Sequence, residues 1–452
     1  MPTARSRNPG ESSSTADRLC RVSYLYAKRP EAGRRSAERS ADREAVSHLG
    51  RGLEVLAGLP ASAERDRMEL DFQLAIGTPL IALSGWSGPQ VAAAYERASE
   101  LCESLDETEH LVPALFGLAS NRVVRGQTRA AQRLAERCRA LAVRRRDPVD
   151  RLLAHRAMGA ALMQLGALGQ ARAEFEAIPA LYDPERDRGL AVRCVTDPRV
   201  SGLSFLALVL WIMGYPDQAR RIAGKASRYA AGLQHANTTG HVLCHGGGGE
   251  LAHLLRDVPA TRGYAEAVIT LAAEHDMPMW RGYGLVLQGW VLAEESQLDE
   301  GMSLVRQGIG ELDALSTVFH RSYHLGLLAG IHVQLGDIAA GQHALEEAYN
   351  EVARTEVRLF EAELRRIEGE LQLLAGVPEA GEACFIEALA VARRQEARSF
   401  ELRAATRLAR LWQRTGRRIE ARDLLAPIYD WFTEGFDTPD LQDARVLVDS
   451  LG

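Results

Sequence analysis

The residues of this sequence best suited to metal chemistry are a group of histidines and one cysteine. His241, Cys244 and His245 lie within five residues, and His253 follows shortly after. On a helix, positions i and i+4 share a face, so His241 and His245 could chelate zinc with Cys244 or His253 as third ligand. No H-E-x-x-H motif is present, and the four glycines at 246–249 leave the geometry open. A metal-dependent enzyme centred on His241, Cys244 and His245 is therefore an alternative hypothesis only.

Motifs for nucleotide or acyl chemistry are not found. A P-loop needs G-x-x-x-x-G-K-[ST], because its amides and lysine hold phosphates. The only Gly-Lys pair is Gly224-Lys225, with Ala219 in place of the first glycine and Ala226 in place of Ser or Thr. No G-x-S-x-G elbow and no strand-like alternation long enough for a cyclase domain occur. The sequence predicts no catalytic residues, no bound metal and no cofactor.

A repeat determines which elements position these residues. Helix-ending turns are predicted at eight positions, and the last four intervals between them are 40 residues each. The predicted turns are at Gly126, Gly166, Gly214, Arg256, Ser296, Gly336, Gly376 and Gly416. Seven residues before every turn stands Ala or Gly, and five residues after it stands Ala, Gly or Thr. Small residues at these places let the two helices of a hairpin come close at their crossing.

This pattern predicts an all-α fold, a tetratricopeptide-like (TPR-like) α-solenoid of about ten helical hairpins with a repeat of ~40 residues. An earlier unit is expected around a turn at Ser40, and a degenerate hairpin at 60–105, interrupted at 85–89. The expected divisions are a disordered or non-native segment 1–20, partly degenerate hairpins at 21–110, and the regular array at 111–452. Two X-Pro steps predict an insert at 182–200.

A candidate groove follows from the inward positions of the first helix in each hairpin. Large aromatic residues with a polar tip recur there, and such residues often anchor partners. The same spacing is also typical of ordinary core packing, so both interpretations stay open. The candidate groove residues are Trp211, Glu250, His253, Tyr283, Trp290 and Tyr323.

Composition excludes several classes of partner. The formal net charge is −6, so no overall positive field attracts nucleic acid or anionic membranes. The longest nearly apolar run, Leu203–Met213, is too short to cross a bilayer. The six cysteines include no C-x-x-C pair, which is typical of a reduced cytoplasmic protein.

Four stretches carry a resemblance to a known family. They are Leu210–Ala219 (LWIMGYPDQA), Glu387–Arg394 (EALAVARR), Ser399–Trp412 (SFELRAATRLARLW) and Ile428–Leu441 (IYDWFTEGFDTPDL). Over residues 22–452 the chain resembles the C-terminal TPR-like region of bacterial class III adenylate/guanylate cyclase and AAA-type ATPase fusion proteins. The cyclase and P-loop ATPase modules that precede this region in the family are absent here. The segment Arg193–Arg199 and the four glycines depart from the family pattern.

The resemblance implies a regulatory or partner-sensing arm of a cyclase/ATPase-type signalling protein. We therefore predict a non-catalytic protein-interaction or ligand-sensing scaffold in the cytoplasm, without nucleic-acid or membrane binding. The expected partner is a protein or peptide, with a cyclase or P-loop ATPase acting in trans as one candidate. The regulatory part of a transcriptional activator is a further alternative, although the sequence ends at Gly452 within a repeat and leaves no helix-turn-helix.

Overall fold

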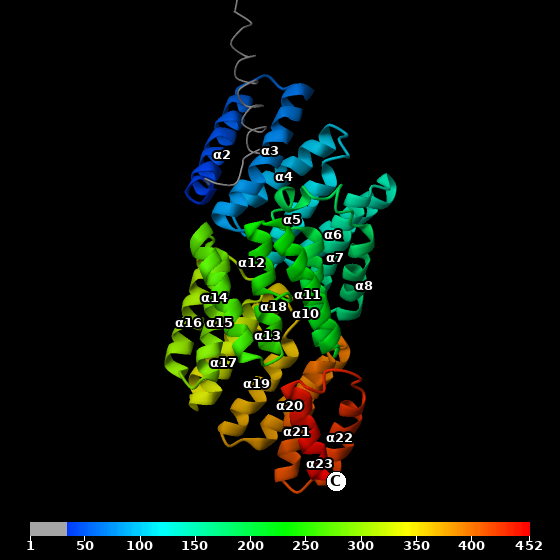
Figure 1. Cartoon of the computed structure of the whole chain (residues 1–452), viewed down its shortest axis with the longest axis vertical. Helices are drawn as coiled ribbons and strands as arrows, with labels where there is room; N and C mark the ends of the chain where they lie inside the picture. The colour runs from blue at the N-terminus through cyan, green and yellow to red at the C-terminus, as the bar shows by residue number, and fades with distance from the viewer. Residues whose placement is uncertain (1–33) are drawn as a thin grey trace, which may run out of the picture.

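Residues 34–452 are described by a computed structural model, in which every regular element of this range is an α-helix (Figure 1). Up to residue 254 the helices are α2 (Arg34–Ala57), α3 (Ala63–Ser84), α4 (Pro89–Ser104), α5 (Leu111–Val124), α6 (Thr128–Arg145), α7 (Pro148–Gln164), α8 (Leu168–Leu181), α9 (Leu190–Arg193), α10 (Pro198–Ile212), α11 (Pro216–Leu233), α12 (Ala236–Cys244) and α13 (Gly249–Leu254). They continue with α14 (Val258–His275), α15 (Pro278–Glu294), α16 (Leu298–Ala314), α17 (Arg321–Leu335), α18 (Ile338–Thr355), α19 (Glu361–Leu374), α20 (Pro378–Gln395), α21 (Arg398–Arg414), α22 (Arg418–Asp430) and α23 (Pro439–Leu451).

All eight predicted turns are present, and each has its named residue in the left-handed backbone region. The φ angles are +66° at Gly126, +75° at Gly166, +92° at Gly214, +58° at Arg256, +67° at Ser296, +71° at Gly336, +76° at Gly376 and +82° at Gly416. A left-handed residue after the last helical turn reverses the chain and satisfies free carbonyl groups. The prediction of a TPR-like α-solenoid with a repeat of about 40 residues is confirmed.

Within residues 34–452 nine hairpins can be followed, from α3/α4 to α21/α22, with α2 before them and α23 after them. The expected turn at Ser40 is wrong, because α2 runs without a break from Arg34 to Ala57. Residues 34–49 contain neither Gly nor Pro, so continuing the helix there carries no propensity penalty. Residues 1–20 lie outside the described range, and the division of the chain at residue 110 stays a prediction.

The small residues predicted at helix crossings are in close contact there. A Cβ atom on Gly369 would lie 2.5 Å from the Phe385 ring, and one on Gly159 would lie 2.6 Å from Phe175. Both phenylalanines are fully buried, so the missing side chain of one helix makes room for the ring of the next. At Gly289 the added atom would meet the Gly301 carbonyl oxygen at 2.6 Å. Close approach of the two backbones therefore requires glycine at these crossings.

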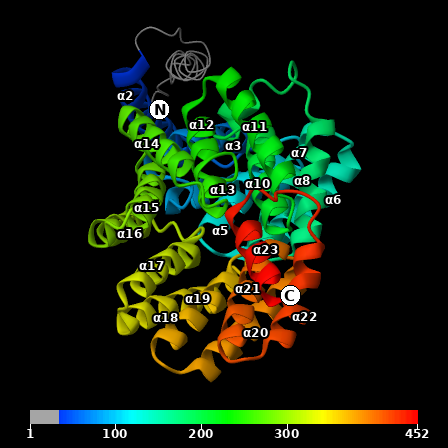
Figure 2. The same cartoon turned by 60° about the horizontal axis from the view of Figure 1, so that its bottom comes forward.

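The superhelix is wound tightly enough for segments about four hairpins apart to touch. The Val318 N–H donates to the Val124 carbonyl at 2.9 Å, and the Arg358 N–H donates to the Gln164 carbonyl at 2.7 Å. Farther along, the Ser399 hydroxyl donates to the Trp211 carbonyl. The view in Figure 2 shows the hairpins arranged around a common interior, with α10 and α13 near its centre. Contacts between turns close this interior, which is why side chains that face it are buried.

Candidate functional site

The six candidate groove residues all lie in the packed interior rather than on an open groove. Their exposed fractions are 8% or less. His253 packs against Trp290, with ring centroids 4.4 Å apart, and its Nδ1 is hydrogen-bonded to the Tyr323 hydroxyl. Tyr283 donates a hydrogen bond to the Phe319 carbonyl oxygen at 3.3 Å. The structure therefore brings His253, Trp290 and Tyr323 into direct contact.

Trp211 lies apart from that group. Its ring packs edge-on against Phe400, with centroids 5.6 Å apart, and the Arg403 guanidinium lies over it at 4.9 Å. These contacts are made across successive turns of the superhelix, since Trp211 belongs to α10 and both partners belong to α21. Trp211 therefore holds two turns together.

The histidine group folds differently from the zinc arrangement considered in the sequence. His241 and His245 share a face, with ring centroids 4.9 Å apart. Among the described residues, however, the group of potential metal ligands that converges is His245, Glu250 and His320. The alternative trio of His241, Cys244 and His245 does not converge, because α12 ends at Cys244 and the glycine loop turns the chain there.

The four-glycine run is what builds this part of the interior. It splits the first helix of the hairpin into α12 and α13 and lets the loop lie directly on α10. A Cβ atom on Gly246 would be 2.0 Å from the Ser204 carbonyl oxygen, so only glycine allows this approach. The loop turns His245 and Glu250 toward each other, with His245 Nδ1 and Glu250 Oε2 3.2 Å apart. The break between α12 and α13 is therefore the place where these polar residues come together.

Glu250 is a buried carboxylate with histidines as its partners. Its Oε1 lies 2.9 Å from His320 Nδ1, and the side chains of Glu250 and His320 are 4% and 1% exposed. Burial by itself would raise the pKa of Glu250, but the charges and hydrogen bonds of His320 and His245 outweigh it, so the pKa is lowered. Burial lowers the pKa of His245 and lowers that of the neighbouring His324 to about 3. The carboxylate of Glu250 is thus held in the interior with the imidazoles of His245 and His320 beside it.

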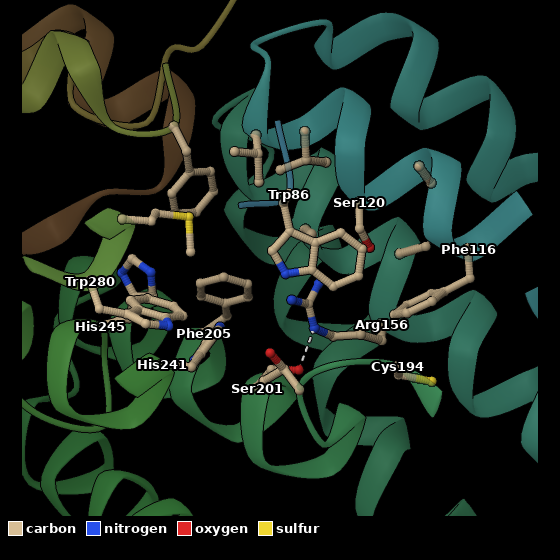
Figure 3. Close-up of a pocket in the computed structure, with 18 of the residues that line it drawn as sticks. Trp86, Phe116, Ser120, Arg156, Cys194, Ser201, Phe205, His241, His245 and Trp280 are labelled. Atoms are coloured by element: carbon tan, nitrogen blue, oxygen red, sulfur yellow. Dashed lines mark hydrogen bonds between the residues drawn. The ribbon is translucent and has the colours of Figure 1, made fainter. Parts of the chain in front are cut away.

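Next to this group is a cavity of about 60 Å³ between α5, α7, α10, α12 and α15 (Figure 3). Aromatic side chains line it on two sides, with Trp86 and Phe116 on one side and Phe205 and Trp280 on the other. Arg156 projects from α7 between Trp86 and Ser201. The guanidinium of Arg156 therefore lies among aromatic side chains in this cavity.

Arg156 has no anionic partner among the described residues. Its Nε donates to the Ser201 hydroxyl at 2.7 Å, and its guanidinium lies 4.6 Å from the centre of the Phe205 ring. Burial lowers the pKa of Arg156 to about 10, so the group remains charged at neutral pH. Arg156 is partly buried, so its guanidinium has lost part of its hydration without gaining an opposite charge. Its Nη donors are therefore available to an anion in the cavity.

His241 supplies a second group without a partner on the same cavity wall. Neither of its ring nitrogens makes a hydrogen bond, and its side chain is buried. Buried polar atoms are normally hydrogen-bonded, so each exception needs an explanation. Arg156 and His241 together form a donor pair that a carboxylate would satisfy.

A second, larger cavity adjoins the first. Its volume is about 370 Å³, and it shares Trp86, Phe116 and Cys194 with the smaller cavity. Its remaining lining is mainly apolar, including Leu49 and Leu153. A ligand with an anionic end and an apolar body would fit both cavities. Its anionic end would lie beside Arg156 in the smaller cavity, and its apolar body would lie in the larger one.

Sequence reasoning missed Arg156, Ser201 and His320. Arginine is abundant throughout this chain, so nothing in the sequence distinguishes Arg156 from the others. His320 lies in a left-handed conformation with φ of +62° just before α17, a signal visible only in the backbone. These residues meet through contacts between superhelical turns, which a repeat pattern does not reveal.

Comparisons with known proteins support the fold. No family model matches the chain. An uncharacterized protein of Rhizobium meliloti is 24% identical over 349 residues, covering 76% of this chain and 33% of that protein. The chain thus spans about a third of the length of this curated relative.

Among solved structures, a Rap protein in complex with competence and sporulation factor is similar over 85% of this chain and all of that one, with a TM-score of 0.55 and 10% identity. A Pyrococcus horikoshii signal transduction ATPase with a tetratricopeptide repeat sensor aligns over 85% of this chain and 55% of its own, with a TM-score of 0.43 and 14% identity. At these identities the Rap likeness shows the fold alone. Between residues 34 and 452 no helix combines the length and apolar character needed to span a membrane.

Proposed function

We propose that this chain is a non-catalytic scaffold that senses a peptide by binding its C-terminal carboxylate inside the superhelix. The observation that carries the proposal is Arg156, a partly buried cation that lines the cavity and has no anionic partner among the described residues. A guanidinium can hold a carboxylate through two parallel hydrogen bonds. His241 offers a further donor, and the aromatic wall suits a large apolar side chain at the end of the peptide.

The proposal also includes the kind of signalling protein that this scaffold would regulate. The family resemblance suggests the sensing arm of a cyclase/ATPase-type signalling protein, with a cyclase or P-loop ATPase supplied in trans as one partner. The curated relative is about three times as long as the matched region, which leaves room for such modules in that protein. The similar Rap structure contains a bound factor, so a superhelix of this kind can hold one.

Binding would act on the whole superhelix because the cavity lies between its turns. Arg156 is on α7, whose end at Gln164 accepts the hydrogen bond from Arg358. A ligand that draws α7, α10 and α15 together would change the pitch and so the outer surface offered to a partner protein. The five described cysteines form no disulfide, which supports a reducing compartment such as the cytoplasm.

Synthetic peptides test the proposal on the full chain. The probes are short peptides ending in Phe or Leu, each made with a free carboxylate and as the C-terminal amide. Trp86 and Trp280 line the cavity, so tryptophan fluorescence reports occupancy. We expect the free acids to bind at least ten times more tightly than the amides, because a charge-assisted hydrogen bond contributes about 1.5–3 kcal/mol.

Variants at Arg156 sharpen the result. Arg156→Met should abolish the preference for the free acid, whereas Arg156→Lys should keep part of it. Arg172→Met is the matched control, since Arg172 is paired with Glu176 on the outer helix α8. Equal affinities for acid and amide in the wild-type chain, or an unchanged preference in Arg156→Met, would contradict the proposal.

A further inference from the structure

We infer that His245, Glu250 and His320 bind one zinc-type divalent metal ion that clasps two turns of the superhelix. The atoms that would coordinate it all lie within 4.8 Å of one another, and all three residues are buried. His245 Nδ1 is 3.2 Å from Glu250 Oε2, and His320 Nδ1 is 2.9 Å from Glu250 Oε1. The site is separate from the peptide-carboxylate proposal, although His245 also lines the cavity.

The charge of Glu250 argues for a cation. Among the described residues, its ion-pair partners are the two histidines, and no lysine or arginine reaches it. A buried carboxylate without a full opposite charge is unfavourable, and such groups are found paired or bound to metal. A divalent ion would supply that charge.

The ligand set and its spacing suit zinc. Two imidazole nitrogens and one carboxylate oxygen are a set that zinc uses when it keeps its fourth position open. In a tetrahedral site with bonds of about 2.0–2.1 Å, neighbouring ligand atoms are roughly 3.3 Å apart. The two nitrogen–oxygen distances given above are close to that value, but they end on different oxygens of Glu250. The carboxylate would have to turn so that one oxygen faces both imidazoles, and the ligand atoms already lie within 4.8 Å of one another.

Gln164 provides a second, independent observation. Its amide nitrogen lies 3.1 Å from His320 Nε2, and its Oε1 is buried without a hydrogen-bond partner. The oxygen and nitrogen of an amide are interchangeable at this level of description. With the amide reversed, His320 Nε2–H would donate to Oε1 and leave the Nδ1 lone pair for the metal. Histidine ligands usually have their other ring nitrogen held in this way.

The position in the fold explains what the ion would do. His245 and Glu250 flank the glycine loop between α12 and α13, while His320 precedes α17 and Gln164 ends α7. Gln164 is also where the backbones of two superhelical turns meet, through its hydrogen bond with Arg358. The ion would thus join the broken hairpin to the segment that closes the next turn.

Metal titration of the full chain tests the inference. Protein treated with chelator is titrated with Co²⁺, whose visible absorption reports tetrahedral coordination, and then with Zn²⁺. We expect one Co²⁺ per chain, displaced by Zn²⁺, and no sulfur-to-cobalt charge-transfer band. Glu250→Gln and His320→Gln should weaken binding at least 100-fold, and Gln164→Leu about 10-fold. His253→Gln, which alters a buried histidine outside the group, should bind like the wild type.

Several results would overturn the inference. They are failure of the wild-type chain to bind one ion, unchanged affinity in both Glu250→Gln and His320→Gln, or a sulfur charge-transfer band assigning Cys244 as a ligand. Circular dichroism of each variant without metal establishes that it is folded. Should Glu250→Gln not fold, the inference is tested by the cobalt spectrum of the wild type and by the affinity of Gln164→Leu for the metal ion.

Discussion

Two polar regions of this molecule, both at least partly buried, differ in how their charges are compensated. In the first, here called the paired cluster, Arg403 lies between Glu363 and Asp440, and Arg366 also contacts Glu363. Burial by itself would raise the pKa of Glu363, but the two arginines outweigh it, so the pKa is lowered. Every charge there has an opposite partner within the chain.

The second region, here called the unpaired cluster, consists of Arg156, His241, His245, Glu250 and His320. Within residues 34–452, Arg156 has no carboxylate partner, neither His241 nitrogen has a hydrogen-bond partner, and Glu250 is paired only with the histidines. Removing one member of a paired network leaves the remaining charges without an opposite charge in a medium of low dielectric constant, which costs stability. Removing a charge that had no partner does not create this cost. The comparison teaches that burial of charge alone does not indicate function, and that missing partners are the better guide.

The largest expected effect is in the paired cluster. Arg403→Met would leave Glu363 and Asp440 with fewer positive partners and would remove the hydrogen bond from Arg403 to the Leu254 carbonyl. We expect a loss of about 3–5 kcal/mol in the free energy of unfolding by urea. In contrast, Arg156→Met should change it by only about 1 kcal/mol, because the substitution leaves behind the neutral Ser201 hydroxyl and no opposite charge. Equal losses in the two variants would remove the distinction between the clusters.

The glycine loop that shapes the unpaired cluster gives the next largest effect. A methyl group at Gly246 would overlap the Ser204 carbonyl oxygen, which belongs to the buried helix α10. We expect Gly246→Ala to cost about 3 kcal/mol, at the upper end of the range for overpacking. Urea unfolding measures the loss. An unperturbed Gly246→Ala variant would show that the loop does not need its close approach to α10.

Acid should lower the free energy of unfolding, because a histidine that is buried in its neutral form takes up a proton more readily in the unfolded chain. Burial lowers the pKa of His253 to about 3, whereas histidine in the unfolded chain has its ordinary value near 6.5. The unfolded state therefore binds more protons below pH 6.5, so stability falls as the pH falls toward 4. At pH 5 this histidine alone should cost about 2 kcal/mol.

His253→Gln isolates this contribution, since glutamine still offers an acceptor to the Tyr323 hydroxyl. Unfolding by urea at pH 7 and pH 5, both with chelator present, should show a smaller pH effect in the variant than in the wild type. The same pH effect in both proteins would mean that His253 is not kept neutral by its surroundings.

The smallest effect is expected at a glycine that packs against nothing. Gly263 lies in α14, the unbroken second helix of the same hairpin, and an added Cβ atom would meet no atom within 4 Å. Gly263→Ala should raise the free energy of unfolding by up to about 1 kcal/mol, because alanine favours the helix. A destabilised Gly263→Ala variant would show that substitution in this hairpin is harmful regardless of packing, and would weaken the argument from Gly246.

The fold could be predicted to a large extent because its signals are local. Each turn depends on one residue in the left-handed region, and each crossing depends on a small residue a fixed distance away, as at Gly369 and Phe385. The turn at Ser40 was predicted wrongly because Gly33, Ala45 and Leu49 fit the repeat positions around it, although small and apolar residues at such spacing are equally compatible with one continuous helix. The candidate groove residues lie in the packed interior, where they contact one another through the winding of the superhelix, and a role for them in binding a partner stays a prediction.

The sequence by itself determined the hairpins, since helix periodicity, turn residues and small crossing residues act within about 40 residues of one another. Only the tertiary structure decided which polar residues meet. Glu250 and His320 are 70 positions apart in the chain, and Arg156 and His241 are 85 apart. Their approach depends on the pitch of the superhelix, which is the sum of many small rotations between hairpins, and no single residue pattern records that sum.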